Sequence, residues 1–279
     1  MLPADESGAA MQRRIGILER PDCRIHYEVA GEGPVLVFAH GLGGNHMSWW
    51  QQVAHFAQGY TCVTFAHRGF WPSSPVEGGP DPQDYAADLD ALCDALGIEE
   101  FALICQSMGG WTGIEYALLR TGRLAGLVLA ATTGSIGWDR LGRDEELAAW
   151  RRGADSARAA CLASGVHPAC GLRMAEEQPA LHLLYRQVDE ANRALDKEGL
   201  RARLGAARTR APEELAAAGC PILLIGNAED VVMPPFAAEA IAAKVPGARH
   251  AMIERAGHSA YFERAAAFNA ILDAFIGGE

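Results

Sequence analysis

Hydrophobic residues in this chain fall into short runs separated by polar segments. Two runs near the beginning, 14–18 and 24–29, alternate with a period of two residues, which predicts an antiparallel hairpin with one covered face. Six further runs predict strands, and most of them are almost continuously apolar, as expected for strands buried on both faces of a mostly parallel sheet. These runs span 34–39, 61–66, 101–105, 124–131, 221–226 and 249–253. The pattern therefore predicts a sheet of about eight strands.

Segments with helical spacing lie between most of these runs. They predict helices over 47–58, 81–97, 111–120, 236–243 and 265–276. The second helix has clear boundary signals, because Asp81 can cap it, Pro82 suits its first position and Gly97 can end it. Alternating strands and helices predict an α/β fold in which right-handed crossovers place helices on both faces of the sheet.

The composition changes between residues 135 and 210, where strand-like runs disappear and Ala, Leu, Arg and Glu dominate. We interpret 135–210 as an inserted helical cap, with breaks expected near Gly153, over 165–168 and near Gly199. The two flanking parts, 1–134 and 211–279, are expected to form one α/β core. Residues 1–11 have the composition of a loose polar leader.

The charge of the chain argues against a nucleic-acid partner, and its distribution differs between the expected cap and the rest of the chain. The net charge of −11 argues against nucleic-acid binding, which needs concentrated Lys and Arg. The cap contains 12 Arg and one Lys against 11 Asp and Glu, a net charge of +2, which leaves −13 for the rest of the chain. Most cap arginines are expected on solvated helix faces. One or two that point into the cleft would instead favour a carboxylate-bearing substrate.

The remaining composition is that of a globular protein without a membrane segment. No apolar run approaches the roughly 18 residues that a membrane span needs, and the first residues lack the apolar core of a signal peptide. The seven cysteines form no C-x-x-C pair and lie mostly in apolar segments, which predicts reduced thiols and a cytoplasmic location. Cys161 and Cys170 could pair in an oxidising setting, although nothing in the sequence requires it.

The most informative stretch is 103–110, in which an apolar run meets Ser107 and then paired glycines. A strand that turns sharply into a helix exposes such a serine and directs the helix N-terminus at the reaction centre. The stretch resembles the G-x-S-x-G nucleophile elbow of the α/β-hydrolase superfamily, with Cys105 in place of the first glycine. The resemblance covers roughly 12–134 and 211–276, and the cap matches only as a generic helical insert.

A serine nucleophile needs a base, and the base needs an acid that orients it. The family order of serine, acid and histidine corresponds here to Ser107, Asp230 and His258, each in a loop after a predicted strand. His258 follows a glycine before the last helix, as the family's base does, and Asp230 lies four residues before a proline, as the family's acid does. Glu229 is the competing candidate for the acid. His40 is expected to have a structural role in its loop.

The resemblance also implies further site residues. The backbone N–H groups of Leu42 and Met108 would form the oxyanion hole. The segment 67–70 resembles the family's D-x-R-G loop with Ala66 in place of the aspartate, so Arg68 is expected to be structural but to lack its usual local partner. Trp71 and Trp111 flank the predicted site, where they could line a substrate pocket or pack in the core.

No motif indicates a metal or a cofactor. The sequence has no H-E-x-x-H pattern, its histidines are scattered, and the Rossmann and P-loop fingerprints are absent. We therefore predict no metal site and no nucleotide cofactor. The serine at position 107 also argues against the family's haloalkane dehalogenases and epoxide hydrolases, which have an aspartate there.

These observations predict a serine hydrolase of the carboxylesterase or lactonase type, acting on a small-molecule ester or lactone. Three alternatives stay open. Hydrolases of carbon–carbon bonds in ring-fission diketones usually carry Trp directly after the histidine, where this chain has Ser259. A cofactor-independent dioxygenase or a ligand-binding receptor of the same fold would share the layout of the triad. The sequence leaves the choice of substrate and the oligomeric state open.

Overall fold

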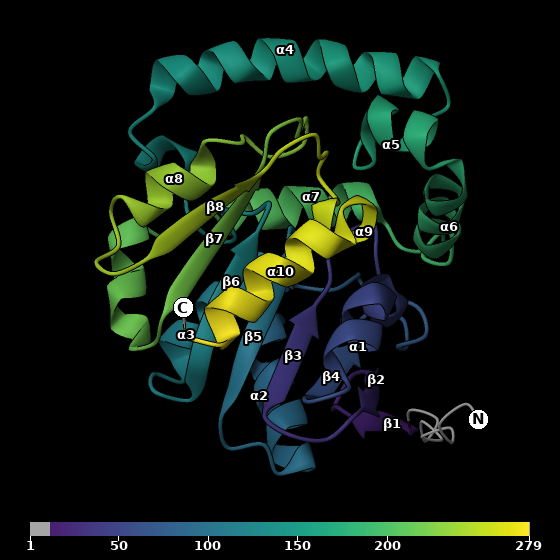
Figure 1. Ribbon diagram of the computed structural model, residues 1–279. Coiled ribbons are helices and arrows are strands. Elements are labelled where there is room, and N and C mark those ends of the chain that lie inside the picture. The colour runs from purple at the N-terminus through teal and green to yellow at the C-terminus, as the bar shows by residue number, and fades with distance from the viewer. Residues whose placement is uncertain (1–11, 279) are drawn as a thin grey trace, which may run out of the picture.

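The computed structural model describes residues 12–278, which surround one eight-stranded sheet (Figure 1). The predicted polar leader, 1–11, lies outside the described residues. The strands are β1 (Arg13–Glu19), β2 (Arg24–Ala30), β3 (Val35–Ala39), β4 (Thr61–Phe65), β5 (Phe101–Gln106), β6 (Leu124–Ala130), β7 (Ile222–Asn227) and β8 (Arg249–Ile253). Their spatial order is β1-β2-β4-β3-β5-β6-β7-β8. The pairs β1–β2 and β2–β4 are antiparallel and the others are parallel, so the predicted mostly parallel sheet is confirmed.

Helices cover both faces of this sheet, as predicted. The helices of the core are α1 (Trp50–Phe56), α2 (Tyr85–Leu96), α3 (Gly109–Leu119), α8 (Ala237–Ala242), α9 (Ala260–Glu263) and α10 (Ala265–Ile276). Side chains of α2, α3 and α8 share one buried cluster with Val37 and Leu103, while α1 and α10 share another with Leu36 and Phe38. Successive strand residues point to opposite faces of the sheet. Because helices cover both faces, both sets of residues are buried, and the central strands are continuous apolar runs in the sequence.

Short 3₁₀ segments extend several of these elements. They are η1 (His46–Trp49), η2 (Pro82–Asp84), η3 (Trp138–Arg140) and η4 (Pro212–Ala218). The boundary signals around α2 act as predicted. The Asp81 carboxylate accepts a hydrogen bond of 3.0 Å from the Gln83 N–H, and Gly97 ends the helix with a φ of 68°.

Four helices form the segment between β6 and β7: α4 (Asp144–Ala163), α5 (Gly171–Glu177), α6 (Pro179–Glu190) and α7 (Lys197–Ala206). In Figure 1, α4 crosses over the ends to which the parallel strands point. The two ends of the segment meet, because Gly137 N donates to Arg210 O at 3.0 Å and Arg210 N donates to Ser135 O at 2.9 Å. On this ground we propose 135–210 as the cap.

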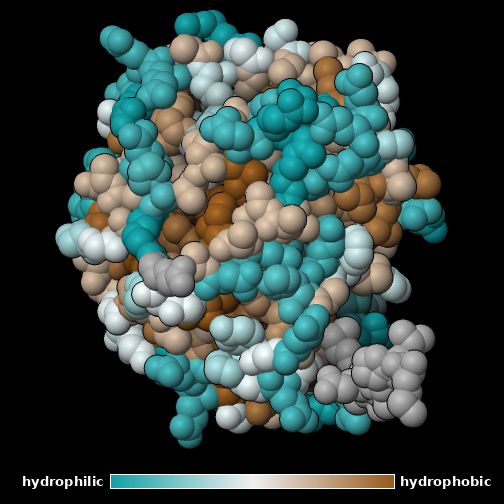
Figure 2. All heavy atoms as spheres, in the orientation of Figure 1, coloured by the Kyte–Doolittle hydropathy of each residue, from teal (hydrophilic) through white to brown (hydrophobic). Residues whose placement is uncertain are grey.

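The longest helix of the proposed cap, α4, has a narrow buried face. Helix α4 buries only Leu147, Ala154 and Cys161, which recur every seven residues and so form a single stripe. Figure 2 shows hydrophilic residues over much of this face of the molecule, with smaller hydrophobic patches between them. Within residues 12–278, no helix is both long and apolar enough to span a bilayer.

One of the three predicted breaks in the cap is wrong, because helix α4 runs through Gly153. The break over 165–168 is present between α4 and α5, and the break near Gly199 is present between Glu190 and Lys197, directly before α7. A glycine inside a helix costs only about 1 kcal/mol, which the surrounding alanines of α4 offset. At Gly199 the backbone N–H is capped by the Asp196 carboxylate at 2.9 Å, so this glycine lies in the first turn of a helix.

Candidate active site

The three predicted catalytic side chains follow three different strands and meet at the carboxyl edge of the sheet. Ser107 follows β5, Asp230 follows β7 and His258 follows β8. His258 Nε2 lies 2.8 Å from Ser107 Oγ, and His258 Nδ1 lies 2.8 Å from Asp230 Oδ2. The side chains therefore form a continuous line of hydrogen bonds from hydroxyl to imidazole to carboxylate.

Ser107 lies at a sharp turn between β5 and α3. Its φ of 51° is in the left-handed region, which few non-glycine residues adopt. Ser107 N donates to Ala130 O at 3.0 Å, and Ser107 O accepts from Thr132 Oγ1 at 2.6 Å and from Gly110 N at 2.9 Å. These bonds to the neighbouring strand and helix hold the backbone of the turn in place, as the elbow motif predicts.

The cysteine in the elbow motif is accommodated by a glycine on the opposite element. A Cβ at Gly113 of α3 would lie 2.6 Å from Cys105 Sγ, so the helix supplies the space that a strand glycine would otherwise give. Cys105 is fully buried, and burial raises the pKa of its thiol. The side chain at this position is therefore a neutral packing group.

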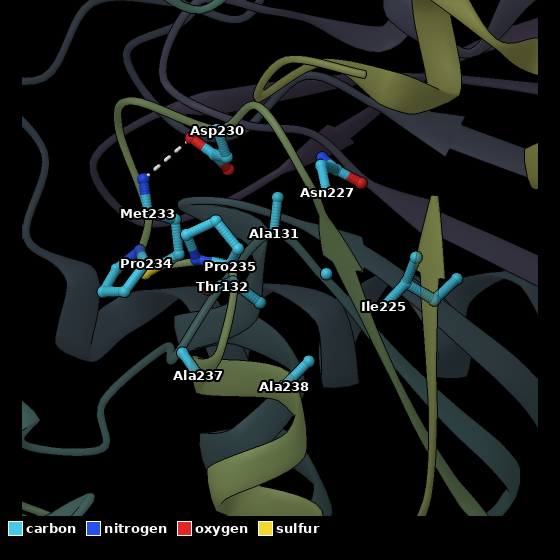
Figure 3. A pocket seen from close by; sticks show the side chains of 11 residues that line it. Ala131, Thr132, Ile225, Asn227, Asp230, Met233, Pro234, Pro235, Ala237 and Ala238 are labelled. Carbon is cyan, nitrogen blue, oxygen red and sulfur yellow. Dashed lines mark hydrogen bonds between the residues drawn. The ribbon is translucent and has the colours of Figure 1, made fainter. Parts of the chain in front are cut away.

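The Asp230 carboxylate is fixed by the backbone of its own loop. Oδ1 accepts hydrogen bonds from Val232 N at 2.7 Å and Met233 N at 2.8 Å, which leaves Oδ2 for His258 (Figure 3). The side chain is 1% exposed. The cavity beside it in Figure 3 has a volume of about 10 Å³, which is the space of about one water molecule and too small for a substrate.

The neighbouring acid, Glu229, points elsewhere. Its carboxylate accepts hydrogen bonds of 2.7 and 2.8 Å from the Arg173 guanidinium, and 38% of the side chain is exposed. Of the two acids that the sequence left in competition, only Asp230 reaches His258.

Three polar residues that the sequence analysis did not identify support His258. Its backbone carbonyl accepts hydrogen bonds from Gln106 Nε2 at 3.1 Å and Asn227 Nδ2 at 3.2 Å. The preceding Gly257 N–H donates to the Glu263 carboxyl group, whose pKa is raised to about 7 by burial, with the Gly257 N–H and Arg264 acting in the opposite direction. Gln106 and Asn227 are the last residues of β5 and β7, and that place at the carboxyl edge is the signal that could have identified them.

Ser107 and His258 line a cavity with a volume of about 790 Å³. Its walls come from the core and from the cap, with Trp111 on the core side and Trp138 and Tyr185 on the cap side. This volume falls in the range of sites for small molecules.

Of the two tryptophans expected near the site, only Trp111 lines this cavity. Trp71 is half exposed, its ring centroid lies 6.2 Å from that of His46, and its backbone N–H donates to Asn192 Oδ1 at 2.8 Å. The loop after β4 thus holds Trp71 away from Ser107, and its prediction as a pocket residue is corrected.

The two backbone amides predicted for the oxyanion hole also border the cavity. Leu42 and Met108 line it, and within residues 12–278 neither N–H donates a hydrogen bond to the protein. The loop before Leu42 must pass close to its neighbours, since a Cβ at Gly41 would lie 2.2 Å from Gln106 Oε1. A glycine at this position allows that close approach.

Comparison with known proteins agrees with this architecture. The family model for the alpha/beta hydrolase fold matches residues 34–265. The chain belongs to this family. A Mycobacterium tuberculosis protein provisionally named non-heme bromoperoxidase BpoC is 30% identical over 269 residues, which cover 87% of this chain and 94% of that protein.

Two further relatives of this α/β hydrolase carry names of hydrolases. A Klebsiella pneumoniae protein provisionally named carbamate hydrolase RutD is 29% identical over 259 residues, covering 86% of this chain and 90% of that protein. The solved structure of the enol-lactonase from Burkholderia xenovorans is similar with a TM-score of 0.72 and 25% identity, covering 91% of this chain and 97% of that one.

His40 has the structural surroundings expected of it. Its Nδ1 lies 2.8 Å from Gly41 O, and its Nε2 accepts a hydrogen bond of 3.0 Å from His67 N. Burial lowers the pKa of His40 to about 4, so the ring is neutral near pH 7. This histidine therefore joins two loops of the α/β hydrolase.

Arg68 has partners despite the alanine at position 66. Its guanidinium donates to both oxygens of Asp88 at 2.6 and 2.7 Å, to Asp84 at 2.8 Å and to Asp22 at 2.9 Å. Aspartates from η2, from α2 and from the turn after β1 thus replace the missing local acid. The sequence analysis could not identify them, because only the fold brings them to this arginine.

Within residues 12–278, one group of side chains consists of potential metal ligands that lie close enough together to bind one ion. The ligand atoms of His26, Glu28 and His46 all lie within 4.8 Å of one another. The first two residues are on β2 and the third is in η1, so the fold unites histidines that are scattered in the sequence. Glu28 also pairs with Arg13 at 3.4 Å, and none of the three donors lines the cavity at Ser107.

Proposed function

We propose that this α/β hydrolase is a serine hydrolase that cleaves a small carboxylic ester or lactone through an acyl-enzyme on Ser107. The observation that carries the proposal is the pair of 2.8 Å hydrogen bonds from Ser107 through His258 to Asp230, at the wall of a cavity of about 790 Å³. A serine paired with an oriented imidazole is the arrangement that activates a hydroxyl for attack on a carbonyl carbon.

The mechanism follows from the atoms involved. Ser107 Oγ attacks the carbonyl carbon while His258 Nε2 takes the hydroxyl proton, which it then gives to the leaving oxygen. Asp230 Oδ2 accepts the hydrogen bond from His258 Nδ1–H and stabilises the imidazolium. A water molecule activated by His258 then releases the acyl group. The amides of Leu42 and Met108 are the proposed donors to the oxyanion, and one such donor contributes roughly 10²- to 10³-fold to the rate.

Other features support the same proposal. The enol-lactonase among the similar structures acts on a lactone, as its name says. Ser259 at the position after the histidine counts against a carbon–carbon bond hydrolase. All seven cysteines are free, which supports a reducing compartment such as the cytoplasm.

A series of p-nitrophenyl esters with increasing acyl length, together with simple lactones, tests the proposal. The unaltered protein should hydrolyse at least one of them, and Ser107→Ala should lower kcat by roughly 10⁴-fold or more. Ser164→Ala changes an exposed serine at the end of α4 that does not line the cavity, and this matched control should retain activity. Inertness toward every ester and lactone, or oxygen uptake during turnover, would overturn the proposal.

A further inference from the structure

A cap arginine lies between two indole rings on the wall of the same cavity. Arg208 follows α7, and its guanidinium carbon lies 4.9 Å from the centre of the Trp111 ring and 4.6 Å from that of Trp138. All three residues line the cavity that contains Ser107. Trp111 is in the first turn of α3, four residues after Ser107, so the guanidinium lies near the reaction centre.

This guanidinium has no anionic partner in the part of the chain that the structure describes. Within residues 12–278, no carboxylate or carbonyl accepts a hydrogen bond from it, and its Nε is buried without a partner. Arg210, two residues later, instead pairs with Glu115 at 2.7 Å and with Glu214 at 3.0 Å. Burying a charged donor without an acceptor costs free energy. A hydrogen-bond acceptor on a bound ligand would reduce this cost at Arg208.

The charge of Arg208 persists at neutral pH. Burial, and to a lesser degree the nearby Arg151, lower its pKa to about 10. Stacking on two indole faces stabilises a cation and leaves the edge of the guanidinium available for hydrogen bonds.

The other charged residues that line the cavity are mostly cationic. Three more arginines line it, Arg158, Arg186 and Arg201, of which Arg158 pairs with Asp155 and Arg186 with Glu190. Asp189 is the acid among the lining residues, and Lys197 pairs with it at 2.5 Å.

We propose that Arg208 binds a carboxylate of the substrate, so that the preferred substrate is an ester or lactone that also carries a free carboxylate. This inference rests on the proposed function and narrows its substrate class. The planar guanidinium matches a carboxylate with two parallel hydrogen bonds. The Trp111 Nε1–H is also buried without a partner.

Two esters with the same number of acyl carbons test the inference: mono-p-nitrophenyl glutarate, which carries a carboxylate, and p-nitrophenyl valerate, which does not. The unaltered protein should have the higher kcat/KM for the glutarate ester. In Arg208→Gln the ratio of the two kcat/KM values should fall by roughly 10- to 100-fold, mainly through KM for the charged ester. Arg208→Lys, which keeps the charge, should restore part of the ratio.

Arg186→Gln is the matched control, because Arg186 lines the same cavity but is paired with Glu190 at 3.3 Å. It removes the same unit of charge and should change the ratio less than threefold. If Arg208 only clamps the cap to the core, Arg208→Gln would lower the melting temperature and both kcat/KM values together, with no change in their ratio. That result, or a preference for the neutral ester in the unaltered protein, would overturn the inference.

A binding measurement separates this inference from the proposed function. Calorimetric titration of Ser107→Ala with monomethyl glutarate should give a Kd that rises at least tenfold when Arg208→Gln is added. Absence of binding, or equal binding by both proteins, contradicts the carboxylate subsite even if neutral esters are hydrolysed. Selective binding without any ester hydrolysis would retain the subsite and reject the proposed function.

Discussion

At the scale of single residues, Glu263 couples folding to pH beside the proposed catalytic histidine. Its side chain is almost fully buried, its Oε2 has no hydrogen-bond partner, and burial raises its pKa from 4.5 to about 7. Between these two values the folded protein retains a proton that the unfolded chain has lost. The free energy of unfolding therefore falls as pH rises through this window, by on the order of 3 kcal/mol for this group.

Glu263→Gln should remove that dependence, because an amide keeps an oxygen for the Gly257 N–H and never ionises. The variant should match the unaltered protein near pH 5 and be the more stable of the two near pH 8, as measured by denaturant unfolding at both pH values. Glu177→Gln is the control. Hydrogen bonds from Arg264 and Arg173 lower the pKa of Glu177 to about 2, so it is ionised throughout this window. An unchanged pH slope in Glu263→Gln would contradict this account.

Single residues also show which parts of the candidate site could be predicted from the sequence and which could not. Ser107, Asp230 and His258 could be singled out because each follows a strand, and the carboxyl ends of parallel strands share one edge. Trp71 and Trp111 could not be separated, since the path of the loop that carries Trp71 depends on a contact with Asn192 in the cap. The partners of an arginine such as Arg208 likewise depend on residues far away in the sequence.

At the scale of elements, the contact between β5 and α3 depends on the pairing of Cys105 with Gly113. Gly113→Ala should destabilise the protein by roughly 1–3 kcal/mol, because the new methyl group would overlap Cys105 Sγ in a packed core. Gly153→Ala is the matched control, as it has open space in the exposed part of α4 and should stabilise the protein by about 0.5–1 kcal/mol. Denaturant unfolding measures both changes.

A second substitution makes this test specific. Replacing Cys105 with glycine in the Gly113→Ala background should recover much of the lost stability. The glycine would then be on the strand and the larger residue on the helix, so the overlap with the Cys105 side chain would be removed. The two substitutions should therefore be non-additive. If Gly113→Ala stabilises the protein as Gly153→Ala does, the close packing of these elements is contradicted.

The elements themselves were largely predictable, and the exceptions have a physical cause. Strands and core helices follow from periodicity and from caps such as Asp81 and Gly97. Gly153 was misread because a glycine weakens a helix without ending it unless the backbone takes a left-handed turn there. Gly165 does take that conformation, with a φ of 68°, and it lies in the break that is present.

At the scale of the whole molecule, the cap leaves the core after β6 and returns before β7, with its two ends joined by the Ile136–Arg210 bridge. This connection holds the cap over the carboxyl edge of the sheet (Figure 1). The core contributes Ser107 and His258 to the cavity, and the cap contributes its arginines. The proposed chemistry could thus be inferred from the core sequence, whereas the proposed substrate preference depends on a surface that only the assembled fold creates.

The most direct test of the central claim is covalent labelling of the protein with a fluorophosphonate, followed by intact-mass and peptide mass spectrometry. The account predicts one adduct per chain, on the peptide that contains Ser107. It predicts no adduct in Ser107→Ala and labelling at least 10²-fold slower in His258→Gln, where the base is lost. An adduct on a different residue, or equal labelling of Ser107→Ala, would contradict the assignment of Ser107 as the nucleophile.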